Sequence, residues 1–566
     1  MTQAAGDAEL ADPAGAGRRR TRPGMRSLVP TLVVVAGALL AAGARLPGIG
    51  WSPRPDESGF TLVARSWHPT AESPFGRYWV DRPPLLIALV RATDALGGVH
   101  GIRWVAVAGC AALVLAAAGV ALEVARTGAP DARGRTVILT VVGTTALVSN
   151  PSIDLVAAKG EVLSLPLLVG SAWLVLRALR TRSWPAAAVA GLLAGTALGL
   201  KQSLTGALVF AAVVLVGEWF RRTLPAGALV RAAAAFLVGM ALPWVAVLAW
   251  ALAEGVHLSA LWYAVFGFRA DALDVIASGP LGAPLRRAVD LVVVSFTSGL
   301  ALLLLWFLLS LRRLGRERPV LTVATLAVLL VDCAALVMGG SYWRPYLFGL
   351  VPTAVLSLAL LASGTPGTSH RPARSRVVTA VVVAVLVAGS VLSGVKWVRT
   401  WPAAAQPSTP LLVGQGIGAA SRPGDTLTVW GGRADIQLAS GLDSPYEHLW
   451  SLPARTRDPR AERLATVLDG PQAPTWFLAW AGLDAWNGLA TSTVGPVLRE
   501  RYVEVGKACR GHRLYRLRDR PRPVPQVGCA AVRAARAASP SSSSSPSPSS
   551  SSTSTSSSSS SSNPNR

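Results

Sequence analysis

The chain has 566 residues, of which 51% are hydrophobic and 15% are charged, and its mean hydropathy is +0.44. A soluble domain of ordinary composition is about 25% charged, so this composition indicates a chain embedded in a bilayer and excludes a soluble enzyme. The formal net charge of +24 is of a size that often indicates nucleic-acid binding. Here the arginines lie in short clusters between apolar runs, as they do in loops that orient membrane helices, and we expect no nucleic-acid partner.

The first 27 residues are polar, with arginines concentrated at positions 18–26. Such a segment imitates the start of a signal peptide, but no convincing cleavage site precedes the next polar stretch. We therefore predict that residues 1–27 form a cytoplasmic basic N-terminus and that the first apolar run is a retained membrane anchor.

Long apolar runs recur between residues 28 and 395. A spanning helix needs about 20 mostly apolar residues, within a range of about 17 to 25. The runs predict an all-α polytopic membrane protein with about 11 transmembrane helices. In chain order the predicted spans are Leu28–Ala44, Trp104–Ala125, Thr136–Ser149, Val162–Leu179, Trp184–Leu200, Leu204–Phe220, Leu229–Leu252, Ala288–Leu311, Val320–Met338, Pro345–Leu361 and Val377–Val395.

Arginine clusters occur at every second predicted loop, which is the pattern of the positive-inside rule. The clusters are Arg126, Arg133 and Arg135; Arg177, Arg180 and Arg182; Arg221, Arg222 and Arg231; Arg312, Arg313, Arg316 and Arg318; and Arg371, Arg374 and Arg376. With the N-terminus in the cytoplasm, the first loop (residues 45–103) and the C-terminal region lie outside. If the apolar run Pro83–Leu96 also spanned, every later loop would be reversed, so we predict an amphipathic helix at the outer surface there.

Residues 396–536 have an ordinary globular composition and predict a small extracytoplasmic α/β domain. Short strands are expected at 426–431, 475–480 and 512–517, with a helix over Pro459–Leu468. The glycine-rich segment Gly414–Gly418 is predicted to be a loop. Cys509 and Cys529 lie in this region and can form a disulfide if it is outside the cell. Residues 537–566 are almost entirely Ser, Pro and Thr and predict a disordered tail.

The first outer loop holds the charges of greatest interest. Asp56 and Glu57 are adjacent just beyond the first span, and Asp81 and Arg82 precede a double proline. An isolated acidic pair in a loop is most often solvated, so spacing alone favours a solvated pair over a catalytic one.

The order of these motifs resembles the GT-C fold glycosyltransferases that use a polyprenyl-phosphate sugar donor. Protein O-mannosyltransferases and the lipid A aminoarabinose transferase belong to this group. The resemblance lies in the acidic motif Asp56-Glu57, in Arg82-Pro83-Pro84-Leu85 some 25 residues later, and in the run Tyr342–Pro352 at the start of a late span. It extends from about Leu28 to at least Val395 and implies a GT-C-like membrane domain.

The resemblance implies a mechanism at the outer face of the plasma membrane. Asp56 is the expected general base, which takes a proton from the acceptor hydroxyl as that oxygen attacks the anomeric carbon. Glu57 is the second acid of the catalytic motif. A single displacement inverts the anomeric centre, and nothing in the sequence demands the nucleophile of a retaining enzyme.

Cations are expected where the lipid phosphate leaves. Arg82, Lys201 and Arg344 are the candidates, although cations at helix ends also reach the interface without binding a ligand. Asp154 is a weaker candidate for a secondary acid. For Lys159 and Glu161 the simpler expectation is a local ion pair. We expect no metal or other cofactor, because no dense ligand set is visible, although these acids are able to support a divalent cation.

The sequence leaves three functions open. The first is transfer of a sugar, hexose or pentose, from a polyprenyl-phosphate donor to an envelope polysaccharide, glycolipid or protein. The second is a transporter or flippase of a lipid-linked precursor, which would hold its ionisable residues near the bilayer midplane. The third is a scaffold, which would leave Asp56, Glu57 and the Arg82 run without a role. High Ala, Gly, Arg and Val contents favour a bacterial source and a mannosyl or arabinofuranosyl donor by association only.

Overall fold

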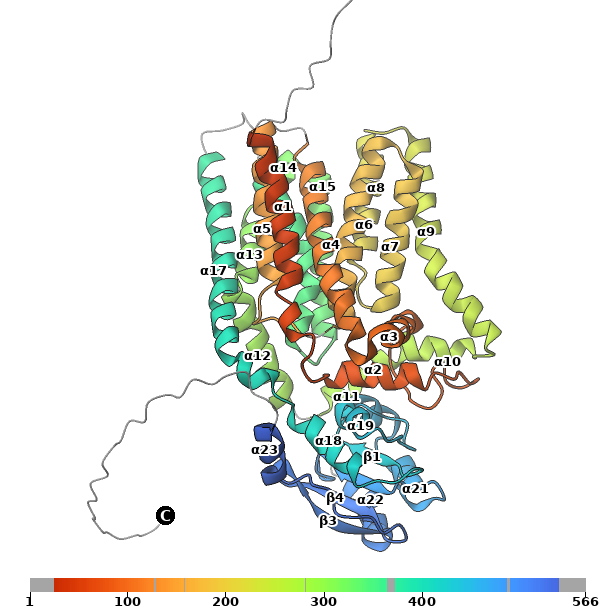
Figure 1. Ribbon diagram of the computed structural model, residues 1–566. Helices are drawn as coiled ribbons and strands as arrows, with labels where there is room; N and C mark the ends of the chain where they lie inside the picture. The colour runs from red at the N-terminus through yellow and green to blue at the C-terminus, as the bar shows by residue number, and fades with distance from the viewer. Residues whose placement is uncertain are drawn as a thin grey trace, which may run out of the picture.

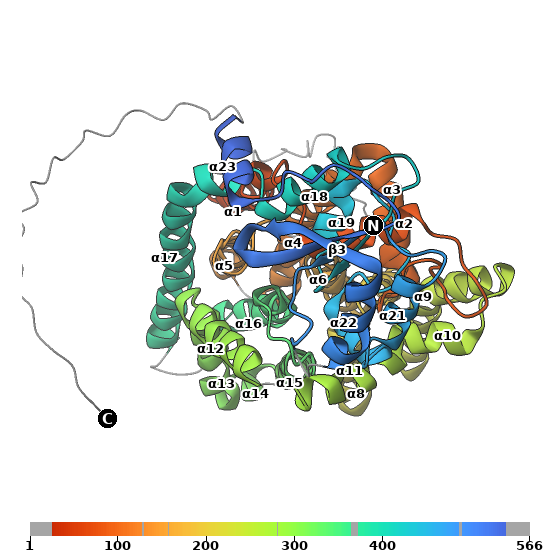
Figure 2. The same ribbon diagram turned by 90° about the horizontal axis from the view of Figure 1, so that it is seen from below.

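The computed structural model describes residues 25–126, 129–156, 158–279, 281–363, 372–485 and 489–538. Almost all of the predicted disordered tail and of the predicted cytoplasmic N-terminus lies outside these ranges. Long helices stand side by side in a bundle, and a small α/β domain lies against one end of it (Figure 1). Seen from below, this domain covers the middle of the bundle, with α17 at one edge and α9 at the other (Figure 2).

The predicted spans correspond in order to helices of the bundle. These are α1 (Met25–Gly43), α4 (Gly101–Val124), α5 (Pro130–Val148), α6 (Gly160–Thr181), α7 (Trp184–Leu200), α8 (Gly206–Arg221), α9 (Ala226–Ala253), α12 (Gly282–Thr297), α13 (Leu300–Leu309), α15 (Pro319–Met338), α16 (Val351–Ala362) and α17 (Pro372–Ala405). Among the described residues, seven helices are long and apolar enough to cross a membrane, or eight if the bent pair α12–α13 is one span. The chain is therefore a multi-pass membrane protein. Helices α5, α7 and α8 are not among the seven, so the predicted number of 11 spans stays a prediction.

One predicted span is broken. The run Ala288–Leu311 divides into α12 and α13, whose axes are bent by 73°. Gly299 lies at the break with φ +81°, a conformation that costs glycine little and other residues more. A β-carbon there would lie 3.0 Å from the Leu386 side chain of α17, so the bend is also closely packed.

The end of the bundle nearest the α/β domain carries short helices. They are η1 (Leu46–Gly48), α2 (Pro55–Arg65), α3 (Pro84–Gly97), η2 (Gly98–His100), α10 (Leu258–Trp262), η3 (Tyr263–Gly267), α11 (Phe268–Ala277) and η4 (Arg344–Leu350); α14 (Leu311–Glu317) lies elsewhere. α2 lies across this end (Figure 1). α3 occupies the range predicted for the surface helix and is separated from α4 at Gly98, where φ is +61°. The predicted span at Pro345–Leu361 begins as η4 and becomes α-helical only at Val351.

The C-terminal domain contains a four-stranded sheet of order β1-β2-β4-β3. β1 (Leu427–Trp430) and β2 (Trp476–Ala479) are parallel, while β4 (His512–Leu517) is antiparallel to both β2 and β3 (Tyr502–Ala508). Its helices are α18 (Thr409–Ala419), α19 (Ala434–Ser440), α20 (Ser451–Arg457), α21 (Glu462–Asp469), α22 (Leu489–Arg501) and α23 (Cys529–Ala538), with η5 (Cys509–Gly511) between β3 and β4. The structure joins Cys509 to Cys529 in a disulfide. Three strands and one helix of this domain occur where they were predicted, although α21 begins three residues later than expected, and β3 was not predicted.

The prediction of a loop at Gly414–Gly418 is wrong, because the segment lies within α18. β-Carbons at Gly414 and Gly418 would lie 2.5 and 2.4 Å from carbonyl oxygens of α19. The glycines therefore allow two helices to pack closely and do not form a ligand-binding turn.

Candidate active site

A cavity of about 930 Å³ lies between the bundle and the α/β domain. Its walls come from α2, from residues 151–156 and 159–161, from α12 and η4, and from the Gly431–Arg433 and Trp450–Arg455 segments of the domain. Nine basic and five acidic side chains line it, which leaves a surplus of positive charge. Such a cavity favours an anionic ligand.

Asp56 lies on the wall of this cavity, in the first turn of α2. Its carboxylate pairs with the Lys159 ammonium at 2.6 Å and accepts a hydrogen bond of 3.1 Å from the Trp450 indole nitrogen. Burial alone would raise the pKa of Asp56, but Lys159, with Arg82 and the Trp450 hydrogen bond, outweighs burial and lowers it to about 2. Asp56 is therefore ionised at any physiological pH.

Trp450 reaches Asp56 from the α/β domain across the surface of α2. A β-carbon at Gly59 would lie 2.2 Å from the Trp450 ring, so only glycine admits the indole at this position. The ring also packs on Phe60, with 5.6 Å between centroids. The C-terminal domain thus contributes directly to the surroundings of the candidate base.

Glu57 has a different environment and does not line the cavity. The residue as a whole is 2% exposed, and its carboxylate accepts two hydrogen bonds from Arg103, of 2.9 and 2.6 Å. It also accepts hydrogen bonds from the backbone N–H groups of Arg54, at 3.0 Å, and Ala158, at 3.2 Å. Both carboxylate oxygens are therefore occupied by the chain itself.

The three cations predicted to bind phosphate all line the cavity, and each has an acidic neighbour. Arg82 pairs with Asp81 at 2.8 Å, and Arg269 pairs with the same carboxylate. Arg344 makes two hydrogen bonds to Asp290, of 2.6 and 2.7 Å.

Lys201 pairs with Glu161, and its ammonium lies 4.6 Å from the centre of the Tyr346 ring. The predicted local pair between Lys159 and Glu161 is wrong, because the two side chains bind Asp56 and Lys201 instead. Asp154, the predicted secondary acid, also lines the cavity. Its carboxylate pairs with Arg54 and accepts a hydrogen bond of 3.0 Å from the backbone N–H of Val156.

Sequence reasoning missed Arg287. Its guanidinium donates to the Ser341 carbonyl at 2.7 Å and lies 4.4 Å from the Trp343 ring centre. Within the described ranges it has no carboxylate partner, unlike the three predicted cations. The sequence feature that could have identified Arg287 is its spacing from Ala283 and Asp290. Residues at this spacing share one face of a helix, and in α12 that face lines the cavity.

No group of three or more His, Cys, Asp or Glu side chains in the described part of the chain is arranged to hold a metal ion. Beside Asp56, the Lys159 ammonium supplies the positive charge that a metal ion would otherwise bring to a carboxylate.

No family model matches this sequence. No curated protein matches it either. Solved structures do match its fold. ArnT from Cupriavidus metallidurans bound to undecaprenyl phosphate matches with a TM-score of 0.52 and 14% identity, over 87% of this chain and 98% of that chain. The apo state of the same protein gives a TM-score of 0.52 with 13% identity, over 86% and 98%.

The chain has the GT-C fold. The apo oligosaccharyltransferase of Archaeoglobus fulgidus has a TM-score of 0.50 and 12% identity, over 88% of this chain and 74% of that one. The expected GT-C-like fold is therefore confirmed. The roles predicted for individual residues are not tested by this likeness and stay predictions.

Proposed function

We propose that this GT-C chain transfers a sugar from a polyprenyl-phosphate donor to an extracytoplasmic acceptor. The observation that carries the proposal is an ionised carboxylate, Asp56, on the wall of a cavity with surplus positive charge at one end of a membrane bundle. The ArnT structure of the same fold holds undecaprenyl phosphate. The domain with the Cys509–Cys529 disulfide then faces the outside, where disulfides persist, and the N-terminus faces the cytoplasm.

In the proposed reaction an acceptor hydroxyl attacks the anomeric carbon, and Asp56 takes its proton. The bond between that carbon and the phosphate oxygen breaks, and the polyprenyl phosphate leaves with the electron pair. The leaving phosphate gathers negative charge that Arg82, Lys201, Arg344 and the newly identified Arg287 stabilise. One displacement inverts the anomeric centre.

A low pKa makes Asp56 a weak base while Lys159 holds it. We propose that the acceptor hydroxyl replaces part of the Lys159 contact as it binds, which raises the basicity of the carboxylate when the proton must move. Glu57, with both oxygens occupied, holds the start of α2 in place rather than acting on substrate.

The proposal is tested by offering radiolabelled polyprenyl-phosphate mannose and arabinose, with a native envelope extract, to membranes that contain this protein. Label that passes to an acceptor supports transfer. If no polyprenyl donor yields label, transport of a lipid-linked precursor becomes the better hypothesis.

Arg287→Gln is expected to raise the KM for the donor about tenfold or more, because a charged hydrogen bond to the phosphate is lost. The neighbouring Arg286→Gln is a matched control, since Arg286 is exposed and does not line the cavity. Donor titrations in the transfer assay measure both variants. Equal donor KM values for the two variants would remove Arg287 from the proposed phosphate site.

Transfer is expected to remain active between pH 8 and pH 5 without an acid limb from Asp56. A carboxyl with a pKa of about 2 stays ionised throughout this window and loses its charge only far below it. The measurement is kcat/KM against pH in the same membranes. A wild-type kcat/KM that falls with a midpoint between pH 5 and 6 would contradict this prediction, because a carboxyl with a pKa of about 2 cannot produce it.

We also propose that no metal ion is required, because the Lys159 ammonium occupies the carboxylate that a metal would need. Activity should survive EDTA at concentrations that strip divalent cations. Loss of activity with EDTA, restored by added Mn²⁺ or Mg²⁺, would overturn this part of the proposal.

A further inference from the structure

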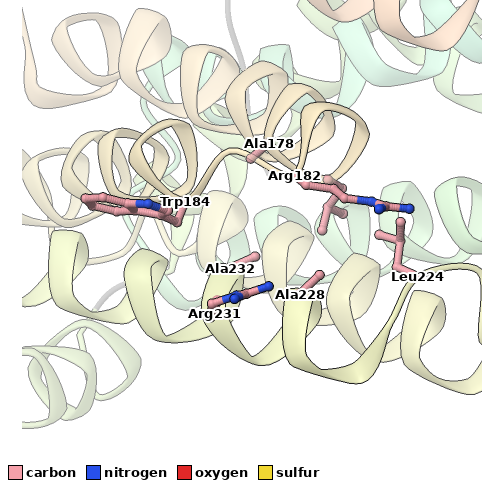
Figure 3. Close-up of a pocket in the computed structure, with 8 residues that line it drawn as sticks. Ala178, Arg182, Trp184, Leu224, Ala228, Arg231 and Ala232 are labelled. Atoms are coloured by element: carbon pink, nitrogen blue, oxygen red, sulfur yellow. The ribbon is translucent and has the colours of Figure 1, made fainter.

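A second cavity lies at the opposite end of the bundle from the candidate active site. Its volume is about 360 Å³, and the end of α6, the start of α7 and the start of α9 surround it. The lining residues are Ala178, Leu179, Arg182, Trp184, Leu224, Ala228, Arg231 and Ala232. Figure 3 shows Arg182 and Trp184 beside the turn between two helices, facing the helix that carries Ala228, Arg231 and Ala232. This is the end of the bundle at which α1 begins (Figure 1), which we predict to be cytoplasmic.

Two positive charges on this cavity lack a counterion. Within the described residues, neither the Arg182 nor the Arg231 guanidinium makes a hydrogen bond or an ion pair, and both side chains are exposed. The neighbouring Arg180 is different, because it pairs with Glu123 through two hydrogen bonds, of 2.7 and 2.9 Å. The charge of this cavity is therefore complementary to an anion.

The remaining lining is apolar, and exposed apolar side chains lie beside it. Ala178 and Leu179 are buried beneath the two guanidiniums, while Trp184 is 63% exposed beside them. Val230, next to Arg231 on α9, is 57% exposed. Tryptophan with one apolar and one polar side is typical of the depth of lipid headgroups.

The cavity is a fixed feature of the packing. α7 and α9 approach so closely that β-carbons at Gly191 and Gly239 would lie 1.9 Å from carbonyl oxygens of the facing helix. This contact holds the two helices together below the cavity, so the space between their ends does not close by a small shift of either helix.

We propose that this cavity binds the headgroup phosphate of an anionic phospholipid of the inner leaflet. Arg182 and Arg231 bind the phosphate, and the acyl chains follow the exposed apolar surface of α9. Basic pockets between membrane helices on the cytoplasmic side are suited to such headgroups. A soluble anion has no apolar part that could pack on Trp184, Val230 and the buried side chains of Ala178 and Leu179. A lipid has acyl chains that could, so a lipid is the favoured source of the phosphate.

The test uses the full chain in detergent micelles with added phosphatidylglycerol or phosphatidylcholine and native mass spectrometry to count bound lipid. Wild type should retain phosphatidylglycerol in preference to phosphatidylcholine, and R182Q/R231Q should lower that retention about tenfold. The matched control is R221Q/R222Q, which removes two exposed arginines from the end of α8 at the same end of the bundle, outside the cavity lining. R182K/R231K, which keeps both charges, should retain most of the binding.

Equal loss of lipid in R182Q/R231Q and in R221Q/R222Q would overturn the proposal, because it would indicate general surface charge. Unchanged retention in R182Q/R231Q would overturn it as well. Displacement of the lipid by inorganic phosphate at equal concentration would show an ordinary anion site. None of these readouts requires transfer activity, so they are independent of the proposed function.

Discussion

Replacement of Asp56 by asparagine is expected to lower the rate of sugar transfer by about 10²- to 10⁴-fold and to leave the fold intact. The amide oxygen still accepts the hydrogen bond from Trp450, and the side chain keeps its size. It cannot take the proton of the acceptor hydroxyl, and general base catalysis contributes about 10²- to 10⁴-fold to a rate. The rate of label transfer should fall by that factor, with the donor KM changed much less, in membranes that contain equal amounts of the two proteins.

Glu72→Gln is the control for this experiment. Glu72 lies between α2 and α3, its side chain is 84% exposed, and it does not line the cavity. It should transfer label at the wild-type rate. If Asp56→Asn is as active as Glu72→Gln, Asp56 is not the base, and Asp154 becomes the next acid to test because it lines the same cavity.

The order of the membrane elements was predictable because it depends on local sequence. Apolar runs mark helices whatever their partners, so the predicted spans correspond in order to bundle helices, and the break at Gly299 was the main local departure. The strands at 427–430, 476–479 and 512–517 were found for the same reason. β3 was missed because it is mostly half-exposed and shows neither an apolar run nor clean alternation.

The partners of the charged side chains were not predictable in the same way. Asp56 and Trp450 are 394 positions apart in the chain, and nothing local to either indicates that they meet. Lys159 and Glu161 are neighbours in sequence, but the chain turns into α6 between them and directs them to Asp56 and Lys201. The sequence therefore locates the loops that form the site and not the pairings within it.

Glu57 illustrates the same limit with an energetic consequence. The acidic motif suggested two catalytic acids, yet Glu57 and Arg103 form a pair whose side chains are only 1% and 3% exposed. Removing one partner of a buried ion pair costs about 3–5 kcal/mol, because an uncompensated charge remains in a poorly solvated site. Glu57→Ala should therefore lower the free energy of unfolding by about that amount, measured by chemical denaturation in detergent micelles.

Glu123→Ala is the control for that loss, because Glu123 pairs with Arg180, whose side chain is 32% exposed, near a helix end. A pair with solvent access contributes about 0–1 kcal/mol, so the free energy of unfolding of this variant should remain close to that of the wild type.

The more conservative variant Glu57→Gln separates a structural role of Glu57 from a catalytic one. If Glu57 only holds α2 against Arg103 and the backbone of Ala158, the folded fraction of Glu57→Gln should transfer sugar at nearly the wild-type kcat. A variant that is fully stable but has lost turnover would return Glu57 to the catalytic motif and contradict the positioning role, since a structural pair affects turnover only through the amount of folded protein.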